Sequence, residues 1–232
     1  MEPHLSARHL YDQQLQDLEH DLLEMGSLAE AMVGQAVEAL VRLDTALAMD
    51  TLVQDDEVDR RDIEIETRCI RLLALQQPMA GDLRVVGTAM KMITDIERVG
   101  DLACDIAKAA LKIEKEMGST DYIDVPKIAG VARAMFRESL EAYVRRDMDL
   151  VRVVCSRDDE VDDLYRLMRG QIHDKMRQSP DDVVSASWLL LAIHHIERIA
   201  DHAVNVAERV AFMMTGTFQQ LVPSHRPDSR EA

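Results

Sequence analysis

Aromatic residues and cysteines are scarce in this sequence, and each scarcity excludes a class of protein. Aromatic residues make up only 3% of the chain, a composition that favours helical bundles over β-sheets. The three cysteines, Cys69, Cys104 and Cys155, show no paired spacing, so neither a disulfide framework nor a cysteine-based zinc site is predicted. We therefore expect an all-helical protein from a reducing compartment.

Basic residues and long apolar runs are also in short supply. The chain has 27 Lys and Arg against 43 Asp and Glu, a formal charge of −16. Such a chain repels a phosphate backbone, so direct nucleic-acid binding is not expected. The longest apolar run, Trp188 to Ile193, is too short to span a bilayer, and the N-terminus has no signal-like pattern. These features predict a soluble, cytoplasmic protein.

Prolines are few and leave long stretches with helical periodicity between them. The predicted helices are Ser6–Leu43, Thr45–Gln76, Gly81–Met117, Val125–Arg146, Met148–Arg177 and Pro180–Met214. A polar segment from Gly118 to Pro126 has the composition of a linker. We therefore predict one bundle over residues 1–120, a second over 121–218 and a disordered tail over 219–232.

An internal repeat supports two bundles of the same kind. The block Glu38–Asp59 reappears as Glu141–Asp162, at an offset of 103 residues (141 − 38). Further along, Ile96–Ala103 matches Ile196–Ala203 at an offset of 100 (196 − 96). This period exceeds that of a solenoid unit, about 20 to 50 residues, and fits a duplicated helical domain. The fold class predicted is all-α, with two homologous three-helix bundles.

Acidic side chains recur at every fourth position of the third predicted helix, so they share one helical face. They are Glu97, Asp101 and Asp105, beside a seam of Ile93, Ile96, Gly100, Ala103 and Ala107. The second half repeats the pattern as Glu197, Asp201 and Asn205, beside Ile193, Ile196, Ala200, Ala203 and Ala207. Like charges at this spacing repel each other unless a cation neutralises them. Oxygen donors of this type predict a site for Mg²⁺, Mn²⁺, Fe or Zn²⁺.

Another helix of each half offers further ligands. Asp59, Asp62 and Glu66 follow helical spacing in the first half, and their repeat equivalents are Asp162, Tyr165 and Arg169. Because only Asp162 remains acidic, we expect the first site to bind metal more tightly than the second.

Salt bridges on a solvated surface are the alternative interpretation of these acidic residues. Under this alternative, Asp62 and Glu66 pair with Arg61 or Arg68. The two acidic stripes, Glu97-Asp101-Asp105 and Glu197-Asp201-Asn205, pair with Arg98 and Arg198. The histidines beside the second stripe, His194, His195 and His202, are interpreted as packed or exposed side chains.

The chain resembles the PhoU family from Leu5 to about Phe218. The resemblance is carried by Ile96-Glu97-Arg98-Val99-Gly100-Asp101, by Ile196-Glu197-Arg198-Ile199-Ala200-Asp201, and by Gln77-Pro78 followed by Asp82-Leu83-Arg84. It implies two three-helix bundles in pseudo-twofold relation, with multinuclear metal clusters on the carboxylates. Glu97, Asp101, Glu197 and Asp201 match the family's motif positions. The chain departs at Ala200, often Gly in the family, which packing should tolerate, and at Arg169, which argues against full occupancy of the second site.

The family's role, by the same resemblance, is negative control of the phosphate-starvation response. A member links the ATPase of a Pst-type phosphate transporter to a PhoR-type sensor kinase, meets the membrane only through these partners and performs no catalysis. We also expect a homodimer. Two other functions stay open: a di-metal carboxylate oxidase, which requires a Glu-x-x-His pair that this chain lacks, and a metal-free helical scaffold.

Overall fold

The computed structural model of the protein describes residues 3–76, 80–218 and 221–222, and the regular secondary structure of these residues is helical. The helices are α1 Pro3–Arg42, α2 Thr45–Gln76, α3 Ala80–Lys115, α4 Val125–Arg145, α5 Met148–Ser156, α6 Asp158–Gln178, the 3₁₀ turn η1 Pro180–Asp182 and α7 Val183–Thr215. Of the predicted tail over 219–232, only Leu221 and Val222 lie within the described residues, where their N–H groups donate to Glu208.

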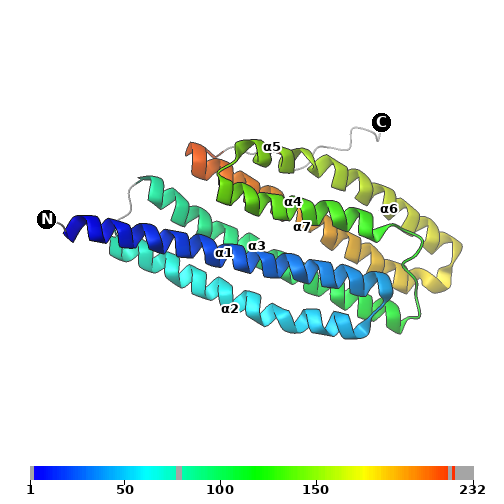
Figure 1. Ribbon diagram of the computed structural model, residues 1–232. Helices are drawn as coiled ribbons and strands as arrows, with labels where there is room; N and C mark the ends of the chain where they lie inside the picture. The colour runs from blue at the N-terminus through cyan, green and yellow to red at the C-terminus, as the bar shows by residue number, and fades with distance from the viewer. Residues whose placement is uncertain (1–2, 77–79, 219–220, 223–232) are drawn as a thin grey trace.

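Two elongated three-helix bundles lie side by side (Figure 1). The first contains α1, α2 and α3, and the second contains α4, α7 and the consecutive helices α5 and α6. The bundles meet through α3 against α7 and α1 against α4, while α2 and the α5–α6 pair lie on opposite outer edges. The predicted all-α fold with two homologous bundles is confirmed. The domain boundary near residue 120 stays a prediction.

The predicted apolar seams form part of the core. In α3 and α7, the seam residues Ile93, Ile96, Ala103, Ala107, Ile193, Ile196, Ala200, Ala203 and Ala207 are all buried. The stretch Pro180–Thr215 is long and apolar enough to cross a membrane by length and composition alone. Here that apolar character supplies the core face with which α7 packs against α3 and α4.

The central helices α3 and α7 run antiparallel across the junction between the bundles. Asp95 of α3 accepts hydrogen bonds from His202 at 3.0 Å and from the Asn205 amide at 3.3 Å. At the equivalent place, His195 of α7 lies near Asp105 of α3. Since 95 and 195, and likewise 105 and 205, are repeat equivalents, the two contacts are related by the predicted pseudo-twofold axis.

Replacing Asp95 with Ala is expected to lower the free energy of unfolding by about 1–3 kcal/mol. Asp95 is only 9% exposed, so its loss leaves two largely buried donors without their acceptor. Urea unfolding followed by circular dichroism measures the change. Lys91→Ala, an exposed position on the same helix, is the control, and an equal effect of both substitutions would contradict this role for Asp95.

Near the same axis, α1 and α4 approach closely. A Cβ atom added at Gly26 would lie 2.5 Å from Leu140 Cδ1, so a larger residue there would require the Leu140 side chain to shift. One turn further along α1, Glu30 accepts a hydrogen bond from Arg133 Nη2 at 2.8 Å. Because 133 − 30 equals the repeat offset of 103, these two oppositely charged residues occupy the same position of the two repeats.

The predicted single helix Met148–Arg177 is wrong, because the chain forms two helices that meet at Arg157. Ser156 Oγ donates to the carbonyl of Val153 at 2.8 Å, an interaction that competes with helix continuation. Three acids then occupy the first turn of α6, where the helix dipole favours negative charge. Arg157 Nη1 also donates at 2.9 Å to the Glu138 carboxylate of α4, so the break is fixed against the neighbouring helix.

Several helix ends differ slightly from the prediction. Leu43, Met117 and Arg146 have positive φ angles of 51–53°, so α1, α3 and α4 end before them. Asp147 caps the next helix, accepting from the N–H groups of residues 149 and 150 at 2.8 and 3.1 Å. The predicted helix from Pro180 begins instead with the 3₁₀ turn η1, because the first bonds after this proline follow the tighter i to i+3 pattern.

Candidate metal centre

Carboxylates from α2 and α3 face one another in the first bundle. We call Asp55, Asp59, Asp62, Glu97 and Asp101 the first carboxylate cluster. Burial raises the pKa of Glu97, and repulsion from Asp101, Asp62 and Asp59 raises it further. Burial likewise raises the pKa of Asp55, with added repulsion from Asp59 and Asp101. The structure therefore brings together four of the predicted residues, and the ionised forms of Glu97 and Asp55 are destabilised by burial and by their neighbours.

Close packing of α2 on α3 creates this cluster. At Gly100, between Glu97 and Asp101, an added Cβ would lie 3.4 Å from Val58 Cγ1 and 3.5 Å from Asp55 Oδ1. These are ordinary contact distances, so a methyl group fits. Ala200 occupies the equivalent place in α7 and is buried, as predicted on packing grounds.

The second bundle forms a matching cluster from α6 and α7. We call Asp158, Asp162, Glu197 and Asp201 the second carboxylate cluster. Burial, followed by repulsion from Asp201, Asp162 and Asp158, raises the pKa of Glu197 to about 7. Loss of solvation also raises the pKa of Asp201, although its side chain keeps contact with solvent. Within the described residues, the buried Oε2 atom of Glu197 has no hydrogen-bond partner.

Sequence reasoning missed Asp55 and Asp158 as members of these clusters. Asp55 is the first acid of the α2 segment that faces α3, and Asp158 is the first acid of the α6 segment that faces α7. The two residues are equivalent under the repeat (158 − 55 = 103). The repeat was the signal that could have found them. Asp55 also lies close to the buried Cys104 thiol of α3.

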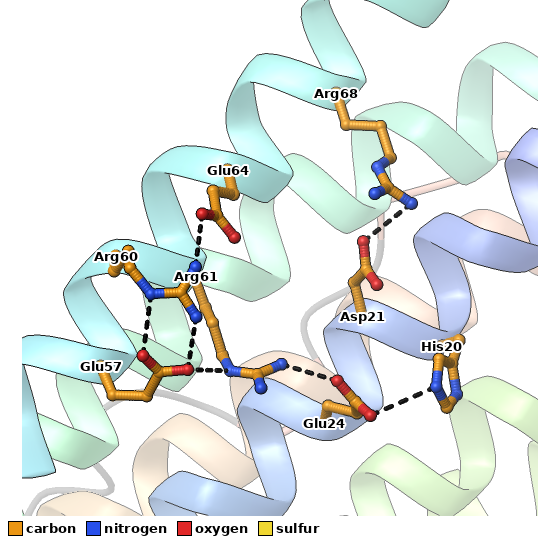
Figure 2. A network of polar contacts seen from close by, with 8 residues as sticks. All are labelled: His20, Asp21, Glu24, Glu57, Arg60, Arg61, Glu64 and Arg68. Atoms are coloured by element: carbon orange, nitrogen blue, oxygen red, sulfur yellow. Dashed lines mark hydrogen bonds and ion pairs between the residues drawn. The ribbon is translucent and has the colours of Figure 1, made fainter.

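The ion pairs that the salt-bridge alternative gave to Asp62 and Glu66, with Arg61 or Arg68, are not the ones that these arginines form. Figure 2 shows that Arg61 and Arg68 both reach acids of α1. Arg61 donates to Glu24 at 2.8 Å and Arg68 pairs with Asp21 at 2.8 Å. The sequence could not reveal this, because the acids of α1 come close only when α1 and α2 pack together.

The same network holds more positive charge away from the first carboxylate cluster. Arg60 pairs with Glu57 and Glu64, Arg61 also contacts Glu57, and His20 lies 3.3 Å from Glu24. Asp62 thus retains a pKa raised by burial and by the neighbouring Glu66 and Asp59. Glu66, the last of the three predicted ligands of α2, is exposed.

Some basic residues do reach the clusters, as the salt-bridge alternative predicts. Arg98 lies 2.6 Å from Asp101 and 3.4 Å from Glu97. In the second cluster, Arg166 lies 3.5 Å from Asp162. Arg198 makes no ion pair with Glu197 or Asp201 in the described part of the chain, so the second motif lacks the direct partner that Arg98 provides in the first.

The third position of each stripe turns towards the junction between the bundles. Asp105 pairs with Lys108 at 2.9 Å and lies near His195. Asn205 donates its amide to Asp95. The structure therefore places both residues between α3 and α7, and their assignment as metal ligands stays a prediction.

All three histidines of α7 lie near acids, and the acid near His195 is Asp105. His202 is bonded to Asp95, as described above, and so is a packed side chain. His194 Nδ1 lies 3.2 Å from Glu197 Oε2, but the geometry is not that of a hydrogen bond, since neither atom has such a partner among the described residues. Burial, reinforced by Arg198, lowers the pKa of His194.

The side chains as placed do not form a finished metal cage. Among the described residues, no three His, Cys, Asp or Glu side chains converge closely enough to hold one ion. What the two clusters provide is concentrated negative charge, oxygen donors and partial burial, a combination that attracts cations.

The family model for the PhoU domain matches residues 22–110 and again residues 125–210. The chain belongs to the PhoU family. Each matched segment covers one bundle and one carboxylate cluster, so the repeat read from the sequence is a repeat of the PhoU domain.

Relatives and solved structures agree with this assignment. The chain is 36% identical over 211 residues to the phosphate-specific transport system accessory protein PhoU homolog of Clostridium acetobutylicum, covering 90% of this chain and 96% of the relative. A crystal structure of PhoU from Pseudomonas aeruginosa superposes with a TM-score of 0.86 at 34% identity, covering 89% of this chain and all of that one. The phosphate transport system regulatory protein PhoU from Streptococcus pneumoniae gives a TM-score of 0.83 at 27% identity, covering 90% and 99%.

Proposed function

We propose that this protein is a non-enzymatic, metal-binding regulator of phosphate homeostasis that acts in the cytoplasm as a homodimer. It connects the ATPase of a Pst-type phosphate transporter to a PhoR-type sensor kinase, and keeps the kinase inactive when phosphate is plentiful. Membership of the PhoU family, together with relatives named as accessory proteins of phosphate-specific transport, supports the phosphate role. The observation that carries the metal-binding part is the pair of matched carboxylate clusters, one in each bundle.

The residues present fit a metal ion in their chemistry. Glu97 and Asp101 in the first cluster, and Glu197 and Asp201 in the second, would supply the motif oxygens, with Asp55, Asp59, Asp158 and Asp162 facing them. The buried Glu197 Oε2 atom is an acceptor without a hydrogen-bond partner among the described residues, and a cation would satisfy it. A bound cation would neutralise the repulsion within each cluster.

Metal loading on this chain requires its own side chains to move. Arg98 holds Asp101, and Arg166 holds Asp162, so these carboxylates must turn away from the arginines to join a common ion. We therefore expect the affinity for metal to rise when Arg98 or Arg166 is replaced. We expect it to fall when one of the carboxylates of the clusters is replaced. The bound ion is divalent or trivalent iron, zinc, manganese or magnesium.

Deleting the gene is expected to raise phosphate-regulated gene expression in phosphate-rich medium. Under the proposal, the sensor kinase then loses the contact that keeps it inactive. A reporter fused to a phosphate-starvation promoter measures the effect, and the intact gene restores repression. Unchanged reporter activity after deletion would contradict the phosphate assignment.

A double variant, Asp101→Ala with Asp201→Ala, is expected to bind little metal and to fail in restoring repression. Elemental analysis of protein purified without added metal measures the first effect, and the same reporter measures the second. The control is Asp149→Ala with Asp174→Ala, two exposed acids that each pair with an arginine of their own helix.

Equal metal content in the double variant and the control would contradict the site assignment. Full repression by a metal-depleted double variant would show that repression does not depend on the bound metal. Protein without stoichiometric metal, whose melting temperature does not respond to a chelator, would favour the metal-free scaffold. Oxygen-dependent absorbance changes in iron-loaded protein would favour the di-metal oxidase.

A further inference from the structure

A histidine distinguishes the second carboxylate cluster from the first. His194 lies one helical turn before Glu197 on α7, and its repeat equivalent in α3 is Thr94 (194 − 100). A threonine hydroxyl offers oxygen only. The duplicated site therefore has a nitrogen donor beside the motif glutamate in one bundle and not in the other.

The spacing of the two donor atoms is that of neighbouring ligands. His194 Nδ1 and Glu197 Oε2 are 3.2 Å apart, both are buried, and neither has a hydrogen-bond partner within residues 3–76, 80–218 and 221–222. Two ligands held about 2.0–2.1 Å from a tetrahedral zinc ion lie roughly 3.3–3.4 Å from each other. A small rotation of either side chain is enough to place one ion between these atoms.

The surroundings of His194 also differ from those of the first cluster. Tyr165 and Arg169 replace Asp62 and Glu66 at the equivalent positions of the facing helix. The Tyr165 ring lies 5.9 Å from the His194 ring, and the Arg169 guanidinium lies 5.7 Å from the Tyr165 ring centre. The second cluster thus has fewer carboxylate oxygens than the first, an aromatic ring beside His194 and one additional arginine nearby.

Ligand type decides which ions such a site prefers. Mg²⁺ and Mn²⁺ are bound mainly by carboxylate, carbonyl and water oxygens, whereas imidazole nitrogen suits Zn²⁺ and similar borderline ions. We infer that His194 makes the second carboxylate cluster a mixed nitrogen–oxygen site selective for zinc-like ions, while the carboxylates of the first cluster favour magnesium- or manganese-like ions. This inference rests on the metal binding proposed above.

Calorimetric titration of the chelator-treated, full-length protein tests the difference between the sites. Asp101→Ala removes the first cluster, so Zn²⁺ and Mn²⁺ titrated separately into this variant report on the second. Adding His194→Gln is expected to weaken zinc binding about tenfold or more, since even loss of a group that only orients a ligand costs about 10–100-fold. Manganese binding should change less than about twofold.

Two further variants complete the test. His173→Gln, at an exposed position of α6 outside the cluster, should leave zinc binding unchanged. Thr94→His, made together with Asp201→Ala to remove the second cluster, should strengthen zinc binding to the first. Melting curves of each apoprotein show whether the variants are folded.

The outcomes separate this inference from the function on which it rests. Zinc binding that is unaffected by His194→Gln, or zinc and manganese affinities that fall together, would overturn the role of His194 and leave metal binding itself in place. Failure of the unmodified protein to bind either ion would overturn both proposals.

Discussion

Glu197→Gln is expected to stabilise the chelator-treated protein by about 3 kcal/mol above pH 7. The pKa of this carboxyl rises from 4.5 in the unfolded chain to about 7 in the folded protein, and one pKa unit corresponds to about 1.4 kcal/mol. The folded protein therefore retains a proton that the unfolded chain releases between pH 4.5 and 7. Stability falls as the pH rises through this window, and the neutral glutamine removes that loss.

Urea unfolding at several pH values between 4 and 8 measures this effect. The variant should show a flatter pH dependence than the original protein over the window. It should also gain less stability than the original protein when Zn²⁺ is added, because its second carboxylate cluster has lost a ligand. Glu97→Gln is the matched control, and we expect a smaller gain there because Arg98 already lies 3.4 Å from Glu97. If the Glu197→Gln variant were less stable than the original protein at pH 7.5, the ionised Glu197 carboxylate would not be destabilising, and the prediction would be wrong.

Ile96→Ala and Ile196→Ala are each expected to lower the free energy of unfolding by about 2–5 kcal/mol. Both side chains are completely buried, one in α3 and one in α7, and truncation loses apolar burial and leaves a cavity. The melting temperature of a protein of this size should fall by roughly 4–20 °C, since each kcal/mol shifts it by about 2–4 °C.

Differential scanning calorimetry compares these two variants with Ile63→Ala. Ile63 is 63% exposed on α2, so its truncation should change stability by no more than about 0.5 kcal/mol. Equal costs at residues 96 and 196 would agree with equivalent packing on the two sides of the pseudo-twofold axis. A small effect at only one of them would contradict the equivalence of the two bundles.

The sequence predicts those features that depend on local spacing or on the repeat. Helical periodicity located the long helices, and the offset of the repeat paired Glu97 with Glu197 and Asp101 with Asp201. The break at Arg157 was missed because its causes are a local hydroxyl bond and a contact with Glu138 of another helix. Periodicity continues through such a break and so cannot reveal it.

Contacts between helices were the least predictable part of the site. Asp95 has no distinctive local pattern, and its bonds to His202 and Asn205 depend on the register of α3 against α7. The same reason explains why the salt-bridge alternative did not identify Glu24 as a partner of Arg61, since Glu24 comes from α1. The repeat gives the composition of each half, but not the relative alignment of the halves.

The ion pair between Glu30 and Arg133 bears on how the duplicated halves recognise each other. If two first bundles associated in this geometry, glutamate would face glutamate across the axis, and two second bundles would bring arginine against arginine. Either arrangement is repulsive, whereas the covalently joined halves present opposite charges. Fusion of the repeats thus allowed one position to diverge into a complementary pair, so that each half discriminates against a copy of itself.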